Sequence, residues 1–366
     1  MRPATDLLPA VLRNPESSTR LSLEQWDLLV RQARQAGLLA RLHDRFVALG
    51  LTETIPHPAR WHFEAAATLA QRQEVAVRWE VGQIRAALAA LDSPLVVMKG
   101  AAYVMAGLPA ARGRLFTDID ILVPQQKLAQ AEAALMLAGW HTAGLSAYDE
   151  RYYRRWMHEI PPMQHLRRAT LIDVHHAILP HTARAFPDPE KLFARIEPIA
   201  DLPGVHVLCA EDRILHSAAH LFHDGELPHG LRDLSDLDLL LRHEALAPRF
   251  WSRLTARAAE LQLGRSLFYA LRYAEHFLDT PVPGEAWESL RPVAPSPALL
   301  RMMDGLFSRA LAPVHASCSD RFTTLARRAA YVRAHWLRMP THLLLPHLFH
   351  KAFISPYQNG DSPNPA

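Results

Sequence analysis

Residues Thr117-Asp118-Ile119-Asp120-Ile121-Leu122-Val123 alternate acidic and branched apolar side chains from Asp118 onward, as a half-buried β-strand does. Residues two apart in a strand share a face, so we expect Asp118 and Asp120 on one side and Ile119 and Ile121 on the other. Two carboxylates about 5 Å apart repel each other by roughly 3 kcal/mol at an effective dielectric constant of about 20. A cation between them removes that repulsion, and magnesium is typically held by one or two carboxylates together with substrate phosphates.

An Asp-x-Asp pattern is weak evidence by itself, because the chain repeats it at Asp236-Leu237-Asp238. There the apolar neighbours Leu234 and Leu241 follow helical spacing, which points the two carboxylates to different sides. The pair at 118 and 120 therefore depends on supporting context, which two neighbouring segments supply.

The segment before the acidic strand predicts a strand that ends in a tight turn. Residues 95–98 form a short apolar run, as in a buried strand, and Lys99-Gly100-Ala101 follow it directly. Glycine at a strand-to-helix turn lets the backbone approach a phosphate, and the N-terminus of the next helix adds amide donors. Two roles stay open for Lys99, which either contacts a phosphate or pairs with the aspartates. The same two roles stay open for Arg114.

A third strand is expected over residues 170–176, after a loop rich in Tyr, Arg and His. Its alternation places Asp173 and His175 on one face. If this strand lies beside the first acidic one, Asp173 joins Asp118 and Asp120 in a group of three carboxylates. The alternative is a surface or salt-bridged aspartate.

The rest of the sequence is helical in pattern, so we expect an α+β core between two helical regions. The predicted division is a helical region over 1–91, the core over 92–200, a helical domain over 201–354 and a loose tail over 355–366. A first helix is expected after Ser22, which is a suitable N-cap. The other predicted helices span residues 61–91, 101–106, 125–138, 211–222, 231–243 and 251–279.

The composition excludes several classes of protein. With 49% hydrophobic and 21% charged residues, the chain can bury a core and is not disordered over most of its length. The net charge of 40 − 37 = +3 does not indicate a dedicated nucleic-acid binder. Two cysteines are too few for a zinc ribbon or a disulfide framework. Without a signal peptide or a membrane-spanning run, we expect a cytoplasmic protein with no membrane partner.

Two motifs resemble those of a known family. Val97-Met98-Lys99-Gly100-Ala101-Ala102 and the later Arg114-Leu115-Phe116-Thr117-Asp118-Ile119-Asp120 resemble the nucleotidyltransferase superfamily typified by DNA polymerase β. In particular, the chain is similar to a poorly characterised bacterial nucleotidyltransferase family with an apolar-Lys-Gly-x-Ala motif before Arg-x-x-[Ser/Thr]-Asp-Ile-Asp. The match runs from about residue 96 to 140 and extends more weakly to Asp173-Val174-His175. The superfamily usually has Gly-Ser or Gly-Gly at the turn, so Gly100-Ala101 lacks a side-chain hydroxyl there.

The resemblance implies a nucleotidyltransferase-fold core, a small mixed sheet with helices, and the chemistry of that superfamily. A nucleoside monophosphate group would move from an NTP, with ATP as the first expectation, to an acceptor hydroxyl, and pyrophosphate would leave. The resemblance implies two Mg²⁺ ions, with Mn²⁺ as the alternative. The implied catalytic and metal-binding residues are Asp118, Asp120 and Asp173. The implied phosphate-binding residues are Lys99, Gly100, Ala101 and Arg114, and His175 is a secondary site residue. The acceptor stays open between a small molecule, a protein and RNA, and a nucleic-acid partner is not favoured.

A histidine-rich helix supplies the main rival hypothesis. His216, His220 and His223 fall at i, i+4 and i+7, on one helical face, and Asp224 follows the last of them. This face could form the metal site of a phosphohydrolase, contact the nucleotide or acceptor, or have a structural role. A non-catalytic nucleotide- or partner-binding protein with the same fold is a further alternative.

Residues 151–156 combine basic and aromatic side chains in the connection between the second and third strands. Such a mixture is typical of surfaces that bind single-stranded nucleic acid. A lid over the nucleotide and a packed loop are the alternatives.

Overall fold

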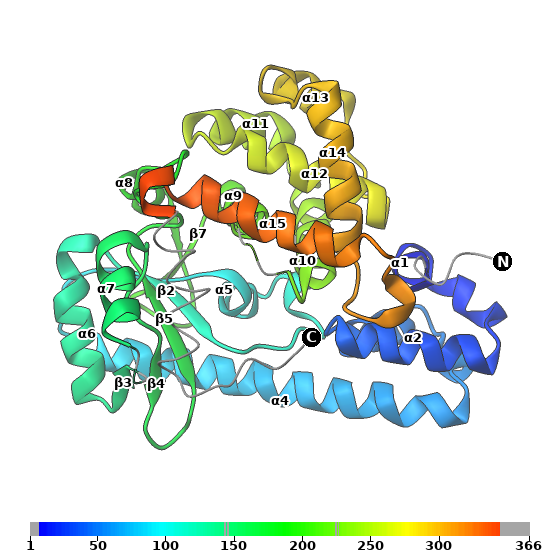
Figure 1. Cartoon of the computed structure of the whole chain (residues 1–366). Helices are drawn as coiled ribbons and strands as arrows, with labels where there is room; N and C mark the ends of the chain where they lie inside the picture. Colours follow the sequence, from blue (N-terminus) through cyan, green and yellow to red (C-terminus); the bar gives the residue numbers. More distant parts are fainter. Residues whose placement is uncertain (1–6, 143, 145, 224, 226, 345–366) are drawn as a thin grey trace.

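The computed structural model describes residues 7–142, 144, 146–223, 225 and 227–344. Within these residues, a seven-stranded mixed sheet carries helices on both sides (Figure 1). This arrangement confirms the predicted core of sheet and helices between helical regions. The strand order is β3-β4-β5-β2-β1-β7-β6. The strands are β1 (Leu95–Val97), β2 (Ile119–Leu122), β3 (Trp140–Thr142), β4 (Met163–His165), β5 (Leu171–His175), β6 (Ile196–Pro198) and β7 (Val205–Leu208).

The strands expected to carry the site residues lie next to each other at the centre of the sheet. β2 pairs with β5 in parallel and with β1 antiparallel. In this register Asp120 is the partner of Asp173. The condition set by the sequence, that the two acidic strands are neighbours, is therefore met.

Sequence analysis predicted β1, β2 and β5 but missed the other four strands of this sheet. Each of the four is only three or four residues long, and polar residues interrupt their apolar patterns. Their extended conformation is stabilised by ladder hydrogen bonds to neighbours distant in the sequence, such as β7 along β1. A run of three residues carries too little periodicity to reveal such a strand.

The helices flank the sheet and extend away from it on the side of the N-terminal helices (Figure 1). Among them, α4 contacts α2 and α3 at one end and α5 and α6 at the other, so it joins the N-terminal helices to the sheet. The helices are α1 (Leu7–Arg13), α2 (Leu23–Gln35), α3 (Leu39–Ala48), α4 (His57–Ala87), α5 (Lys99–Met105), α6 (Leu128–Leu137), α7 (Ala147–Trp156), α8 (Pro189–Phe193), α9 (Ala210–His223), α10 (Gly230–Glu244), α11 (Phe250–Glu260), α12 (Gly264–Leu278), α13 (Gly284–Leu290), α14 (Pro297–Ala310) and α15 (Thr323–Arg338).

The helix predictions are confirmed at most places, but the connection expected to be a loop before β5 contains helix α7, and one predicted helix is divided. Ser22 caps α2 as expected, and its side chain and that of Gln25 form a reciprocal capping box. The single helix predicted over 251–279 is instead the pair α11 and α12. Gln262, in the left-handed region with a φ of 58°, breaks the helix between them. The apolar spacing continues through this break, which is why the sequence did not reveal it.

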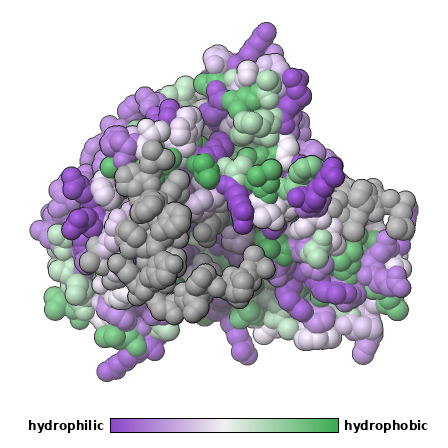
Figure 2. All heavy atoms as spheres, viewed as in Figure 1, coloured by the Kyte–Doolittle hydropathy of each residue, from purple (hydrophilic) through white to green (hydrophobic). Residues whose placement is uncertain are grey.

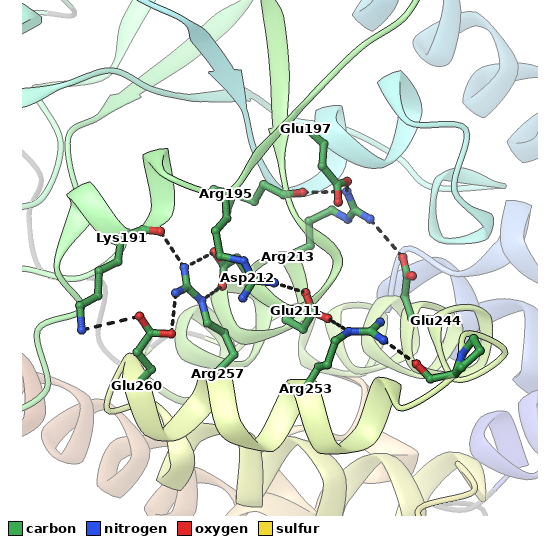
Figure 3. A network of polar contacts seen from close by, with 12 residues as sticks. Lys191, Arg195, Glu197, Glu211, Asp212, Arg213, Glu244, Arg253, Arg257 and Glu260 are labelled. Atoms are coloured by element: carbon green, nitrogen blue, oxygen red, sulfur yellow. Dashed lines mark hydrogen bonds and ion pairs between the residues drawn. The ribbon is translucent and has the colours of Figure 1, made fainter.

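Two kinds of contact join the C-terminal helices to the sheet. One continuous cluster of buried apolar side chains extends from Leu8 to Ala330. A network of ion pairs also surrounds the start of α9 and connects α8 and β6 with α10 and α11 (Figure 3). At its centre Asp212 is fully buried and accepts two hydrogen bonds from Arg257, at 2.7 and 2.8 Å. The predicted division at residues 91 and 200 stays a prediction, and the predicted tail lies outside the described residues.

Candidate active site

The candidate site lies where β2 and β5 run side by side. Asp120 is only 3% exposed, and Asp173 is its register partner on β5. One carboxylate oxygen of each lies within 4.8 Å of the other and of a nitrogen of His175. Asp118 directly precedes β2 and lines the same pocket as Asp120. The structure thus places the three aspartates singled out in the sequence in one region.

Lys99 lies directly beside these carboxylates. It is the first residue of α5, and its left-handed φ of 46° turns the chain from β1 into the helix. Its Nζ donates a hydrogen bond to Oδ1 of Asp120 at 2.6 Å. Of the two roles left open by the sequence, the structure shows the pairing with an aspartate.

Gly100 allows Arg114 to pass close to the turn. A Cβ atom at position 100 would collide with the guanidinium of Arg114, so only glycine fits without movement of that side chain. Arg114 Nε donates to Oδ2 of Asp236 on α10 at 2.8 Å, and Arg41 holds the other oxygen of Asp236 at 2.7 Å. The acidic partner of Arg114 is therefore on α10 and not on the acidic strand. Ala101 is buried beneath the turn.

Glu159 is an acidic residue of this region that the sequence analysis missed. Its Oε2 lies 3.3 Å from Nε2 of His175, and the same nitrogen lies 3.0 Å from Oδ1 of Asp120. Glu159 pairs with His175 through a single antiparallel bridge at the edge of β5. No local motif marks Glu159, and only this long-range pairing reveals it.

The pKa values in the site indicate an excess of negative charge. Burial raises the pKa of Asp173 to about 7, and the carboxylates of Glu159 and Asp120 add to the rise. Burial and the neighbouring Asp120 also raise the pKa of Asp118. Burial would raise the pKa of Asp120 too, but the Lys99 ammonium and a histidine outweigh it and hold that pKa well below its usual range. Among the described residues, these four carboxylates therefore pair with one lysine and one histidine, while the nearby Arg114 is paired with Asp236, and a bound cation would relieve the excess.

Helix α9 supplies another wall of the pocket. His220 and Ser217 line it together with the two aspartates of the acidic strand. Burial, followed by the nearby Lys99, lowers the pKa of His216 to about 3. Lys99 and burial lower the pKa of His220 well below its usual value. Both imidazoles are therefore neutral at pH 7, facing a cluster of carboxylates.

His223 lies in a different environment from the other two histidines of α9. Its Nδ1 lies 3.1 Å from the carbonyl oxygen of Ala219 and 3.5 Å from the hydroxyl of Ser266 on α12. Among the residues that the structure describes, no cluster of three or more side chains that could hold a metal ion includes a histidine of α9. Asp224 lies outside those residues. The phosphohydrolase hypothesis therefore gains no ligand set from the described part of the chain.

The pocket between these elements has a volume of about 100 Å³. It is lined by Lys99, Gly100, Tyr103, Arg114, Thr117, Asp118, Asp120, Ser217, His220, Arg232, Asp233 and Asp236. A larger apolar groove of about 680 Å³ lies between α12, α14 and α15, and apolar side chains gather over α14 in Figure 2. None of the described residues that line that groove is a carboxylate, so we assign the chemistry to the smaller, charged pocket.

The basic and aromatic segment 151–156 belongs to helix α7, which packs on the rest of the molecule. Arg154 forms ion pairs with Glu132 on α6 and Glu150 on α7. Burial raises the pKa of Tyr153, and the negative charges of Glu159 and Asp173 raise it further, which places this ring near the acidic site. Of the alternatives from the sequence, this arrangement favours a packed segment beside the site.

A mixed sheet that carries paired acidic strands beside a Lys-Gly turn is the arrangement expected of a nucleotidyltransferase-type fold. The chain belongs to the uncharacterised nucleotidyltransferase family, whose model matches residues 22–279. No curated protein and no solved structure matches the chain. Within the described residues, no helix has both the length and the apolar character needed to cross a membrane.

Proposed function

We propose that this chain transfers a nucleoside monophosphate from an NTP to an acceptor hydroxyl, with Mg²⁺ held by Asp118, Asp120 and Asp173. The main supporting observation is the register of β2 and β5, which sets Asp120 beside Asp173. Lys99 and Gly100 line the same pocket as Asp118 and Asp120. Membership of the nucleotidyltransferase family supports nucleotidyl transfer in general.

The three aspartates suit magnesium because carboxylate oxygens are the ligands that this ion prefers. Burial and the neighbouring carboxylates raise the pKa values of Asp118 and Asp173, and a cation bound between them would oppose both rises. When bound there, Mg²⁺ would neutralise the phosphate oxygens and lower the pKa of the acceptor hydroxyl. Two ions, or Mn²⁺ in place of Mg²⁺, fit the same carboxylates.

The other residues of the pocket bind and orient the substrates in this proposal. Lys99 contacts the phosphates with the ammonium that now pairs with Asp120. Arg114, held in place by Asp236, presents a second positive charge to the same pocket. Gly100 permits the close approach of this guanidinium.

The reaction itself is an in-line substitution. The acceptor oxygen forms a bond to the α-phosphorus while the bond from that phosphorus to the bridging oxygen breaks, and pyrophosphate leaves with the bond electrons. Asp173 takes the proton of the acceptor hydroxyl. We expect ATP as the donor, and the proposed acceptors are a small molecule, a protein side chain or an RNA end.

Thermal melting with ATP, GTP, CTP and UTP, each with and without Mg²⁺, tests this proposal. We expect one nucleotide to raise the melting temperature only when Mg²⁺ is present. Asp118→Asn and Asp120→Asn should abolish the rise, whereas Asp201→Asn, a control at an exposed turn, should preserve it. If no nucleotide shifts the melting temperature, the proposed donor site is wrong. Binding that needs Mg²⁺ but gives no turnover with any acceptor would indicate a non-catalytic binding protein.

A further inference from the structure

A second group of metal-type ligands lies beside the three aspartates. One nitrogen of His158, one nitrogen of His175 and one carboxylate oxygen of Glu159 all lie within 4.8 Å of one another. None of these residues is among the three aspartates to which the proposed function assigns Mg²⁺. Two imidazoles and a carboxylate therefore meet at one point next to the acidic strands.

Backbone pairing holds these three residues in place. The N–H groups of His176 and Ala177 donate to the carbonyl oxygen of His158, at 2.8 and 3.3 Å. The N–H of Ile160 donates to the carbonyl of Val174 at 3.0 Å, and residue 159 bridges to His175 between these bonds. The segment 158–160 is thus fixed along the end of β5. Ligands held by the backbone before an ion arrives lose little entropy when they bind it.

Hydrogen bonds within the protein do not satisfy the two histidines. Nδ1 of His158 and Nδ1 of His175 are both buried and, within the described residues, neither has a hydrogen-bond partner. Nε2 of His175 faces carboxylate oxygens of Asp120 and Glu159, but one ring nitrogen carries at most one proton. Buried polar atoms are nearly always paired in native proteins. The unpaired Nδ1 of His158 therefore points to a ligand from outside the chain, and Nε2 of His175 would bind the same ion once it gives up the proton that it shares between two carboxylates.

The distances and the ligand types both suit a transition metal ion. Two ligands that each lie about 2.1 Å from a tetrahedral ion are about 3.4 Å apart. The distance from Nε2 of His175 to Oε2 of Glu159 is 3.3 Å. Two histidines and one carboxylate are typical ligands of zinc and of other first-row divalent ions, whereas magnesium prefers oxygen ligands alone.

We propose that His158, Glu159 and His175 form a separate site for a divalent transition metal ion, with Zn²⁺ as the occupant. The ion takes a nitrogen from each histidine and an oxygen from Glu159. It places positive charge beside Asp120 and Asp173, where carboxylates outnumber cations. Since it shares no ligand with the three aspartates, the site can exist even if the proposed nucleotide site is wrong.

Calorimetric titration of the metal-free protein with Zn²⁺, in a large excess of Mg²⁺, tests this site. We expect one Zn²⁺ ion to bind despite the Mg²⁺. His158→Gln and Glu159→Gln should each weaken that binding at least about 10-fold, because each removes a ligand. His243→Gln, at an exposed position of α10, and Asp118→Asn should leave it unchanged. Asp118→Asn should still abolish the Mg²⁺-dependent effect of the nucleotide, so the two proposals can fail separately.

X-ray absorption at the zinc edge of the wild-type protein with one equivalent of Zn²⁺ provides a test that needs no variant. We expect the scattering pattern of two imidazole rings and at least one oxygen ligand. The proposal is overturned if no Zn²⁺ ion binds in the excess of Mg²⁺, if the spectrum lacks two imidazoles, or if a folded His158→Gln protein binds Zn²⁺ as well as the wild type. If His158→Gln does not fold, the wild-type spectrum decides.

Discussion

Two clusters of charged side chains differ in their balance of charge, although α9 borders both. At the start of α9, five carboxylates meet five cationic side chains (Figure 3). The carboxylates are those of Glu197, Glu211, Asp212, Glu244 and Glu260, and the cations are Lys191, Arg195, Arg213, Arg253 and Arg257. Farther along α9, at the candidate site, the described residues bring four carboxylates together, and the side chains that pair with them are a lysine and a histidine, because Arg114 in the same pocket is paired with Asp236.

The difference separates groups that hold the fold together from groups that bind a ligand. In the balanced network each carboxylate has a cationic partner, so the ion pairs can fix β6, α9, α10 and α11 relative to one another. In the candidate site burial, and after it the neighbouring carboxylates, raise the pKa of Asp173 and Asp118, which means that their charges oppose folding. A cluster that opposes folding in the free chain is best explained by a cation that binds there.

The largest expected effect comes from breaking the balanced network at its centre. Arg257→Met leaves the carboxylate of Asp212 fully buried and without the guanidinium that now donates to both of its oxygens. We expect the free energy of unfolding to fall by about 3–5 kcal/mol, as measured by urea denaturation. Lys191→Ala is the matched control, because its pair with Glu260 is exposed and 3.8 Å long, and it should change stability by less than about 1 kcal/mol. If the two substitutions lower the free energy of unfolding equally, the buried pair of Asp212 and Arg257 does not hold the fold together more strongly than the exposed pair does.

The opposite sign is expected when one carboxylate is removed from the candidate site. Asp173 has a pKa of about 7 in the folded chain and 3.8 in the unfolded one. Between these values the folded state holds the extra proton, so wild-type stability should fall as the pH rises from about 4 to 7. Asp173→Asn removes this fall and should stabilise the metal-free protein at pH 8 by about 2 kcal/mol. Urea denaturation at pH 4.5 and pH 8 measures the difference.

Added Mg²⁺ sharpens the test of Asp173. Under the proposed function the ion stabilises the wild type by binding its carboxylates, whereas Asp173→Asn loses a ligand. The stability advantage of the variant at pH 8 should therefore shrink as Mg²⁺ is added. A variant that is less stable than the wild type at pH 8 without metal would show that Asp173 supports the fold.

The sequence predicted the residues of the candidate site better than their arrangement. Asp118, Asp120 and Asp173 could be found because alternation in a strand and short motifs are local features. The pairing of β2 with β5 is not local, since Asp120 and its partner Asp173 are far apart in the chain. Glu159 was missed for the same reason, because only its bridge to β5 brings it to the site.

The fold shows the same limit. Long helices such as α9 and α10 were predicted nearly to their ends, because many turns repeat the same spacing. The short outer strands were missed because their neighbours stabilise them. The partner of Arg114 could not be foreseen either, since Asp236 lies on a helix that reaches the turn only in the folded chain. Its own pattern, Asp-x-Asp on a helix, correctly indicated that Asp236 and Asp238 point to different partners.

The smallest expected effect concerns His223, which lies in the last turn of α9, beyond both clusters along that helix. Burial lowers the pKa of His223 to about 4, and the positive charge of Arg333 lowers it as well. The hydrogen bond to the carbonyl oxygen of Ala219 acts in the opposite direction. In the unfolded chain His223 takes up a proton near pH 6.5, whereas in the folded protein it does so only near pH 4. Between these values the unfolded state binds more protons, so stability should fall as the pH falls through this range. His223→Asn keeps a polar group near the position of Nδ1 but does not titrate.

We therefore expect the variant to lose less stability than the wild type between pH 7 and pH 5, by on the order of 1 kcal/mol. His243→Asn, at an exposed position, is the control and should keep the wild-type slope. His223 is the informative choice because it lies away from the carboxylates, with contacts to Ala219 and Ser266. An unchanged slope in His223→Asn would mean that this imidazole takes up its proton as readily in the folded protein as in the unfolded chain, so burial in α9 would not keep it neutral.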